Sequence, residues 1–254
     1  MKVTLLGTGT SQGVPVIACH CEVCSSKDPK DKRLRSSVMI EVDNQTLVVD
    51  TGPDFRQQML RHSVEKVDGI LFTHHHKDHV AGMDDVRAFN YRWNTDMQLY
   101  CSNITAAALK NEFPYVFSKE KYPGTPNVKL NIIENKKFKI NDINIIPIKA
   151  KHYMMPIFGF RIKDFIYLTD VSAISDIEKE KMRGADLIIL DALRKKEHIS
   201  HFNLDQAVAL LTELKPKRAL LTHISHYMGL YNVINKELPA HIQLAYDGQQ
   251  IILD

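Results

Sequence analysis

Five side chains that can bind a metal ion, four histidines and an aspartate, lie within a stretch of six residues in the first third of the chain. Four of them follow the pattern His-x-His-x-Asp-His: His74, His76, Asp78 and His79. Neutral imidazole and carboxylate groups suit zinc, manganese and iron(II). In extended backbone His74 and His76 point to the same side, and a turn at Lys77 and Asp78 brings the other two groups toward the same pocket. The pattern predicts a metal site in preference to a tag or a solvated polar loop, with His75 pointing away from it.

Short apolar segments that are typical of strands come before the candidate ligands. Residues 69–72 precede the histidine pattern, and single carboxylate or imidazole residues follow other such segments. These residues are Asp50, His152, Asp170, Asp191 and His223. One such residue at a strand end is usually a cap or a satisfied polar group. The same placement in several strands favours one shared metal site at the edge of a sheet.

Three of the four cysteines lie close together in the sequence. They are Cys19, Cys21 and Cys24. In a chain of this size with no visible signal peptide, this spacing favours a structural zinc over disulfide bonds. Tetrahedral zinc needs a fourth ligand, for which Cys101 and His226 are the candidates. Three unliganded thiols and an iron–sulfur cluster are the alternatives.

The composition is that of an ordinary globular protein, with 44% hydrophobic and 25% charged residues. The formal net charge of +3 gives no case for binding nucleic acid through charge alone. No apolar run approaches the length of a membrane span, and the apolar stretch at residues 3–6 is too short for a signal peptide. We expect a cytoplasmic protein whose partners include neither a membrane nor nucleic acid. A homodimer is compatible with the sequence.

Apolar segments and turn residues predict strands and helices along the whole chain. Strands are expected at 3–6, 37–42, 46–50, 69–72, 99–101, 128–133, 143–148, 158–162, 165–168, 187–190, 219–222, 241–246 and 250–253. Helices are expected at 53–61, 80–90, 175–183, 204–214 and 228–238, and an irregular loop at 113–127. This order favours an α/β (α+β) fold with two sheets packed face to face and helices outside. Because no linker is visible, we count residues 1–254 as one domain.

Taken together, the candidate ligands resemble those of the metallo-β-lactamase superfamily, and specifically its phosphodiesterase branch. Seven residues match the ligands of that branch in order and approximate spacing: His74, His76, Asp78, His79, His152, Asp170 and His223. The resemblance extends over nearly the whole chain and implies a four-layer αββα sandwich.

Other motifs are more specific to one subgroup of that superfamily. They are Leu-Gly-Thr-Gly-Thr-Ser-Gln-Gly-Val-Pro at 6–15, Cys-x-Cys-x-x-Cys at 19–24 and Leu-Thr-His-Ile-Ser-His at 221–226. These motifs are similar to the phosphoribosyl cyclic phosphate phosphodiesterases. In that subgroup the three cysteines and the second histidine of the late pair hold a structural zinc. The resemblance therefore implies a zinc site made of Cys19, Cys21, Cys24 and His226.

The resemblance also implies a dinuclear active site with two divalent metals, zinc or manganese. One metal would be bound by His74, His76 and His152, the other by Asp78, His79 and His223, and Asp170 would bridge them. A hydroxide between the metals would attack a small, cyclic phosphodiester, and a histidine would protonate the leaving alkoxide. His201 aligns with that general acid, and His198 is the second candidate.

We expect His201, Asp78 and Asp170 to carry catalysis. Asp50 and Asp191 would orient imidazoles of the metal ligands, with a role as structural caps as the alternative for each. Three alternatives stay open. Hydrolysis of a thioester, lactone or β-lactam is the first, because one fold can host all these reactions. An RNA-processing nuclease of the ribonuclease Z branch is the second, although no basic, glycine-rich arm is visible. A metal-stabilised binding module is the third, and the intact ligand set argues against it.

Overall fold

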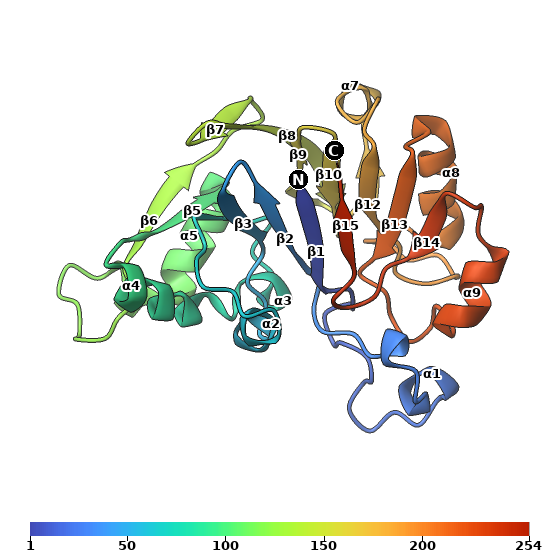
Figure 1. Cartoon of the computed structure of the whole chain (residues 1–254), viewed down its shortest axis with the longest axis horizontal. Coiled ribbons are helices and arrows are strands. Elements are labelled where there is room, and N and C mark those ends of the chain that lie inside the picture. The colour runs from blue at the N-terminus through green and yellow to red at the C-terminus, as the bar shows by residue number, and fades with distance from the viewer. Residues whose placement is uncertain (254) are drawn as a thin grey trace.

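The computed structural model describes residues 1–253, which form two β-sheets packed face to face (Figure 1). The first sheet has the strand order β15-β1-β2-β3-β4-β5-β6. Its strands are β1 (Lys2–Gly7), β2 (Ser37–Val42), β3 (Gln45–Val49), β4 (Gly69–Leu71), β5 (Met97–Cys101), β6 (Val128–Ile132) and β15 (Gln250–Ile252). From β3 to β6 neighbouring strands are parallel, so their carboxyl ends meet at one edge.

The second sheet has the order β11-β8-β9-β10-β12-β13-β14, with β7 paired to β8. Its strands are β7 (Phe138–Ile140), β8 (Ile143–His152), β9 (Met155–Ile162), β10 (Phe165–Leu168), β11 (Ala173–Ile174), β12 (Leu187–Asp191), β13 (Arg218–Thr222) and β14 (Ile242–Leu244). Four neighbouring strands of this sheet are parallel to one another: β10, β12, β13 and β14. This sheet therefore also has an edge where several carboxyl ends meet.

Most helices flank the outer faces of the sheets, whereas α1 lies in a loop that projects beyond them (Figure 1). They are α1 (Glu22–Ser25), η1 (Pro29–Asp31), α2 (Phe55–Arg61), α3 (Lys77–Val80), η2 (Met83–Val86), α4 (Arg87–Trp93), α5 (Asn103–Glu112), α6 (Pro114–Phe117), α7 (Asp176–Glu180), α8 (Leu204–Leu214) and α9 (Tyr231–Glu237). The α2, α4 and α5 helices lie outside the first sheet, and α8 and α9 lie outside the second. Within residues 1–253, none of the helices has the length and apolar character needed to cross a bilayer.

Three hydrophobic cores hold these layers together. One core lies between the sheets and includes Val49 from β3 and Ile189 from β12. A second packs the outer face of the second sheet against α8 and α9, and a third packs the outer face of the first sheet against α2 and α5. Strand periodicity explains the division, since Ile188 and Leu190 alternate with Ile189 and face the helices. The result is the predicted four-layer αββα sandwich.

The structure corrects several of the predicted elements. The expected helix at 80–90 is broken into α3, η2 and α4, because the chain at Gly82 packs directly against the backbone carbonyl of Gly52. The α5 helix was not predicted, and α6 occupies the beginning of the expected loop at 113–127. The β8 strand is longer than expected and ends at His152, which is therefore part of the strand. The strands expected at 37–42 and 46–50 form an antiparallel hairpin, β2–β3, whose turn residues Asp43 and Asn44 have φ angles of 48° and 59°.

Candidate metal centre

The seven predicted ligands come together where carboxyl ends of strands from both sheets meet. His74 and His76 follow β4, His152 ends β8, and their ligand atoms lie within 4.8 Å of one another. A second group with the same spacing consists of Asp78, His79, Asp170 and His223. Asp170 also lies within this distance of His152 and His201, so it stands beside both groups. The structure thus brings together every residue of the predicted ligand set.

Three residues at this edge adopt a backbone conformation that is rare for side chains other than glycine. Asp50 after β3, Asp170 after β10 and His223 after β13 have φ angles of 64°, 60° and 58°. Left-handed backbone at such residues costs free energy and is concentrated at functional sites. Each strand therefore turns sharply as it ends, at the position where its polar residue joins the cluster.

Unpartnered nitrogen atoms in the cluster fit metal ligation. Within residues 1–253, Nε2 of His74, Nε2 of His79 and Nδ1 of His223 are buried and make no hydrogen bond. Oδ2 of Asp170 lies 3.3 Å from Nε2 of His79 and 3.2 Å from Nδ1 of His223. A buried nitrogen without a partner is costly, and a divalent cation between these nitrogens and the carboxylate would satisfy them. The donor set of imidazoles and carboxylates is the one that zinc and manganese accept.

Burial and neighbouring charges set the protonation of the cluster. Burial lowers the pKa of His74 well below its usual value and that of His223 to about 4, so both imidazoles are neutral at pH 7. Burial raises the pKa of Asp170, but His223 and His79 outweigh this effect and hold the pKa well below its usual range. His74 and His223 are therefore neutral and Asp170 is charged, the states in which these groups bind metals. Burial lowers the pKa of His79, but the neighbouring carboxylates outweigh this effect and raise the pKa well above its usual value.

A network of polar contacts supports the ligands from behind. Oδ2 of Asp50 lies 2.7 Å from Nδ1 of His79 and accepts a hydrogen bond from the Thr73 hydroxyl at 2.8 Å. The same hydroxyl lies 3.0 Å from Nδ1 of His74. Asp50 and Thr73 thus connect one ligand of each group. The predicted contact of Asp50 with a ligand imidazole is present, whereas Thr73 was missed because no motif marks a threonine as a support.

Two further supports come from segments far away in the sequence. Oγ1 of Thr10 lies 3.3 Å from Nε2 of His223, and the backbone carbonyl of Ser200 lies 2.7 Å from Nδ1 of His152. Both contacts leave the other ring nitrogen directed at the cluster. The sequence analysis does not predict these roles for Thr10 and Ser200. Thr10 does lie in the motif at residues 6–15 that resembles the phosphodiesterase subgroup.

His201 is next to the centre, and His198 is farther away. Nδ1 of His201 lies 3.3 Å from Oδ2 of Asp191 and 3.9 Å from Oδ1 of Asp170. Burial lowers the pKa of His201, but Asp191 and Asp170 outweigh it and raise this pKa to about 9. The His198 ring lies 5.3 Å beyond that of His201, and its Nδ1 is 3.1 Å from the Ser200 hydroxyl. His75 belongs to neither ligand group, as expected.

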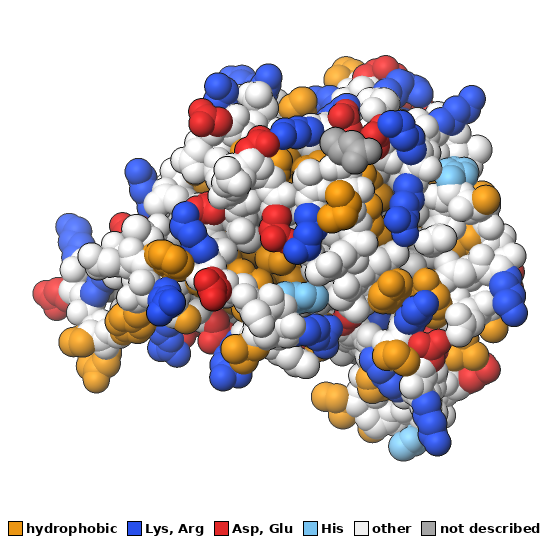
Figure 2. Space-filling model, in the orientation of Figure 1, with side chains coloured by type: hydrophobic (Ala, Val, Ile, Leu, Met, Phe, Trp, Pro, Cys, Tyr) orange, Lys and Arg blue, Asp and Glu red, His pale blue; other side chains and the backbone are white. Residues whose placement is uncertain are grey.

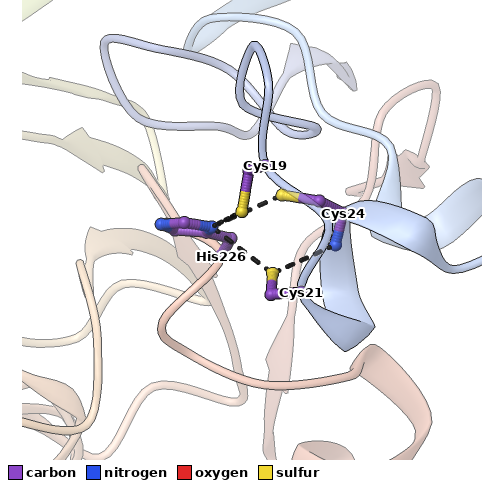
Figure 3. A group of neighbouring side chains, drawn as sticks. All are labelled: Cys19, Cys21, Cys24 and His226. Atoms are coloured by element: carbon purple, nitrogen blue, oxygen red, sulfur yellow. Dashed lines mark hydrogen bonds between the residues drawn. The ribbon is translucent and has the colours of Figure 1, made fainter.

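The three clustered cysteines meet His226 at a second site (Figure 3). Their sulfur atoms lie 3.2 to 3.5 Å from Nδ1 of His226: Cys19, Cys21 and Cys24. Three thiols around one imidazole are a ligand set for tetrahedral zinc. The backbone N–H of Cys24 contributes most to lowering the pKa of Cys21, to about 6, which favours the thiolate that zinc requires. Cys101 is instead buried in the core outside the first sheet.

Comparison with known proteins identifies relatives in sequence. Residues 45–224 match the family model described as Beta-lactamase superfamily domain. A Porphyromonas gingivalis protein called octanoyltransferase is 37% identical over 257 residues, a match that covers 100% of this chain and 52% of that protein. The chain therefore spans about half the length of this relative.

Two solved structures are similar over the full length of the chain. One is described as a new diphosphatase from the PhnP family and has a TM-score of 0.93 at 39% identity, covering 100% of this chain and 98% of that one. The other is Zn²⁺-bound PqqB from Methylobacterium extorquens, with a TM-score of 0.81 at 18% identity and complete coverage of both chains. At the lower identity the likeness concerns the fold alone.

Proposed function

Because the chain belongs to the beta-lactamase superfamily, we propose that it is a metal-dependent phosphodiesterase acting on a small, cyclic phosphodiester. The observation that carries this proposal is the convergence of seven ligand residues, three of them with buried and unpartnered nitrogens. The PhnP-family diphosphatase, 39% identical, supports a reaction at phosphorus.

The proposal assigns two divalent ions, zinc or manganese, to the candidate metal centre. Each ion has three ligands of its own: His74, His76 and His152 for one, and Asp78, His79 and His223 for the other. Asp170 would serve both ions, because its carboxylate stands beside both groups. Bound divalent ions lower the pKa of water to roughly 7 and neutralise charge on a phosphoryl group.

A histidine of the protein would donate the proton that the leaving oxygen needs. Nδ1 of His201 faces the Asp191 carboxylate, so Nε2 is the atom that can give a proton to the leaving oxygen. Asp191 would hold the ring in place and stabilise its charged form. We favour His201 over His198, since His201 contacts Asp170 directly. The raised pKa of His201 is consistent with an acid that is protonated at pH 7.

The proposal also assigns one structural zinc to Cys19, Cys21, Cys24 and His226. This site would not take part in the reaction, because its role is to fold the loop between β1 and β2. We treat residues 1–254 as one domain, and the homodimer and the cytoplasmic location remain expectations of the sequence.

A second candidate function is the hydrolysis of a diphosphate ester. The specific observation in its favour is the similarity to a PhnP-family diphosphatase. A thioester hydrolase is a third class to test, since the Porphyromonas gingivalis relative is called an octanoyltransferase. Binding of RNA is not favoured, because Lys and Arg side chains are scattered among acidic ones over the face seen in Figure 2.

The decisive experiment pairs metal analysis with a substrate panel. We expect about three metals per chain, one of them zinc that resists chelation, together with hydrolysis of bis(p-nitrophenyl) phosphate. The panel should include a ribosyl cyclic phosphate, a nucleoside diphosphate ester, a lactone and an octanoyl thioester. A single tight zinc with no turnover after manganese or zinc is added would reject the proposal. Turnover of the thioester alone would replace it with the third class.

A further inference from the structure

The candidate metal centre is accessible from one side. His76 is the exposed ligand, whereas the side chain of Asp78 is 12% exposed and the other ligands are buried. A substrate must therefore approach past His76. From there a row of imidazole rings extends across the opening, with centroids 5.0, 4.6 and 5.3 Å apart: His76, His152, His201 and His198.

Two loops beside this row carry large apolar side chains that are exposed. Tyr153 and Met154 form the tip of the β8–β9 hairpin, directly after His152, and are 54% and 78% exposed. Ile199 follows His198 and is 71% exposed. The bond between Nδ1 of His152 and the Ser200 carbonyl ties the two loops together. We call Tyr153, Met154 and Ile199 the apolar rim.

The backbone holds the hairpin tip in a defined conformation. Tyr153 has a φ of 54°, in the left-handed region that aromatic residues rarely adopt, and its N–H donates to the Ser172 hydroxyl at 2.8 Å. The exposed ring is therefore placed by a specific turn. Exposed apolar side chains on loops beside a polar cluster suit a ligand site, because such sites combine apolar walls with a few polar groups.

We propose that the apolar rim binds an aromatic group on the leaving arm of the substrate. The inference rests on the proposed function, because it places the phosphoryl group at the candidate metal centre. His201 connects the candidate metal centre to the apolar rim. It lies between Asp170 of the centre and His198, and Ile199, the residue after His198, belongs to the rim. A group attached to the oxygen that His201 protonates would thus meet the rim. Contacts with such a group would contribute binding energy away from the reacting atoms.

The test compares the binding of phenylphosphonate and methylphosphonate to protein loaded with zinc or manganese. Both probes carry the same anion and differ in the group that would reach the rim. We expect the phenyl compound to bind roughly tenfold more tightly or better. Dissociation constants come from ligand-dependent shifts in melting temperature, and inhibition constants from hydrolysis of bis(p-nitrophenyl) phosphate.

Matched variants test whether the apolar rim causes the preference for phenylphosphonate over methylphosphonate. Ile199→Ser and Tyr153→Asn should reduce the ratio of the two affinities toward one, and asparagine suits the left-handed backbone at position 153. Ile177→Ser on α7 is the control, because Ile177 is 77% exposed and lies outside the rim. This variant should keep the ratio of the unmodified protein.

The outcomes separate this inference from the proposed function. A ratio near one in the unmodified protein, or an unchanged ratio in both rim variants, would overturn the inference. Equal binding combined with ester hydrolysis would leave the proposed function intact. Selective binding of phenylphosphonate without hydrolysis of any phosphoester would support the rim and reject the proposed function. Failure of both probes to bind would overturn the inference as well.

Discussion

Thr10 joins the N-terminal loop to the candidate metal centre through a single hydroxyl group. Its Oγ1 lies 3.3 Å from Nε2 of His223, and its N–H donates to the Ile224 carbonyl at 3.1 Å. Thr10→Val keeps the shape and removes the hydroxyl, so His223 loses the contact that orients it. We expect activity or metal affinity to fall by about 10- to 100-fold, measured by kcat and by metal titration. Thr10→Ser is the control and should retain most of both, whereas a fully active valine variant would contradict this role.

Asp170 is the carboxylate that stands beside both ligand groups. Asp170→Asn preserves the size of the side chain and removes its charge, so two cations at the centre would lose a shared anionic ligand. We expect turnover to fall to background and the metal content of the centre to drop, while the zinc at the cysteine cluster is kept. Mass spectrometry and the hydrolysis assay measure both.

The matched control for Asp170→Asn is Asp142→Asn in the exposed β7–β8 turn. It should behave like the unmodified protein. A fully active Asp170→Asn variant with an unchanged metal content would show that the carboxylate does not bridge.

At the residue scale the sequence could predict which candidate ligands the fold brings together, but not the residues that support them. His74, His76 and Asp78 are recognisable because several ligands lie within one short pattern. His152 and His223 could be added because each ends an apolar strand. Thr73 gave no local signal, since its role depends on contacts with Asp50, 23 residues away. Supports of this kind become visible only when the chain is folded.

The loop between β1 and β2 carries the three cysteines of the cysteine cluster. Its tip projects beyond the sheets (Figure 1), and its small apolar cluster includes Val14, Val23 and Cys24. Cys21→Ser should therefore remove one tightly bound zinc and lower the melting temperature while sparing much of the catalysis. Mass spectrometry and calorimetry check this.

The control for the cysteine cluster is Cys101→Ala. Cys101 is buried among apolar side chains outside the first sheet, so its truncation should cost stability without loss of zinc. Unchanged zinc content in Cys21→Ser, or loss of zinc in Cys101→Ala, would contradict the assignment of the four ligands.

Glu178 connects α7 to the second sheet through hydrogen bonds and an ion pair. Its carboxylate accepts hydrogen bonds from Asn135 at 2.6 Å and from the Lys149 N–H at 2.9 Å, and it pairs with Lys181 at 2.8 Å. Burial raises the pKa of Glu178, but these three partners outweigh it and hold the pKa below its usual value. The stabilisation is therefore present above the unfolded pKa and is lost as pH falls through the folded pKa.

Glu178→Gln should reduce the free energy of unfolding by about 1–3 kcal/mol near neutral pH. The difference from the unmodified protein should shrink at acidic pH, as the pH falls through the folded pKa of Glu178. Urea unfolding near neutral pH and at acidic pH measures the free energy of unfolding of both proteins. The exposed Glu180→Gln is the control, with an expected change within about 0.5 kcal/mol. A difference that stays constant with pH would contradict an electrostatic role for Glu178.

Among the elements, strands were easier to predict than helices. The strands β10 and β12 are apolar on both faces because each faces a core on either side, and such runs are visible in sequence. The break of the expected helix at 80–90 was not visible, because it depends on the contact between Gly52 and Gly82. The α5 helix carried a local signal that was overlooked, since Ser102 caps it by accepting a hydrogen bond from the Thr105 N–H.

At the scale of the whole molecule, the predicted membership of the metallo-β-lactamase superfamily and the four-layer sandwich are confirmed. The chain adopts the fold of that superfamily, and phosphodiester hydrolysis is the reaction that we propose for it. Sequence could predict this level because the ligand pattern and the order of strands belong to the whole superfamily. Substrate specificity depends on loop side chains such as those of the apolar rim, and these follow no shared pattern.

The distribution of charge predicts little affinity for polynucleotides. The net charge is +3, and basic side chains are interspersed with acidic ones where Figure 2 views the surface. Transfer RNA should therefore cause no retardation of the protein in a gel at physiological salt. A complex that weakens steeply as salt rises would contradict this prediction and return the ribonuclease Z class to consideration.

The cysteine cluster also bears on the order of folding. It joins Cys19, Cys21 and Cys24 to a histidine that lies 202 to 207 residues later in the chain. Closing a loop of that length costs about 5 kcal/mol of chain entropy, which isolated contacts cannot offset before the strands between them have formed. The three cysteines are therefore close together from an early stage of folding, whereas His226 joins them only after the strands between them have formed. Completion of the cluster marks a late step of folding, at which a bound ion would draw the N-terminal loop against the finished second sheet.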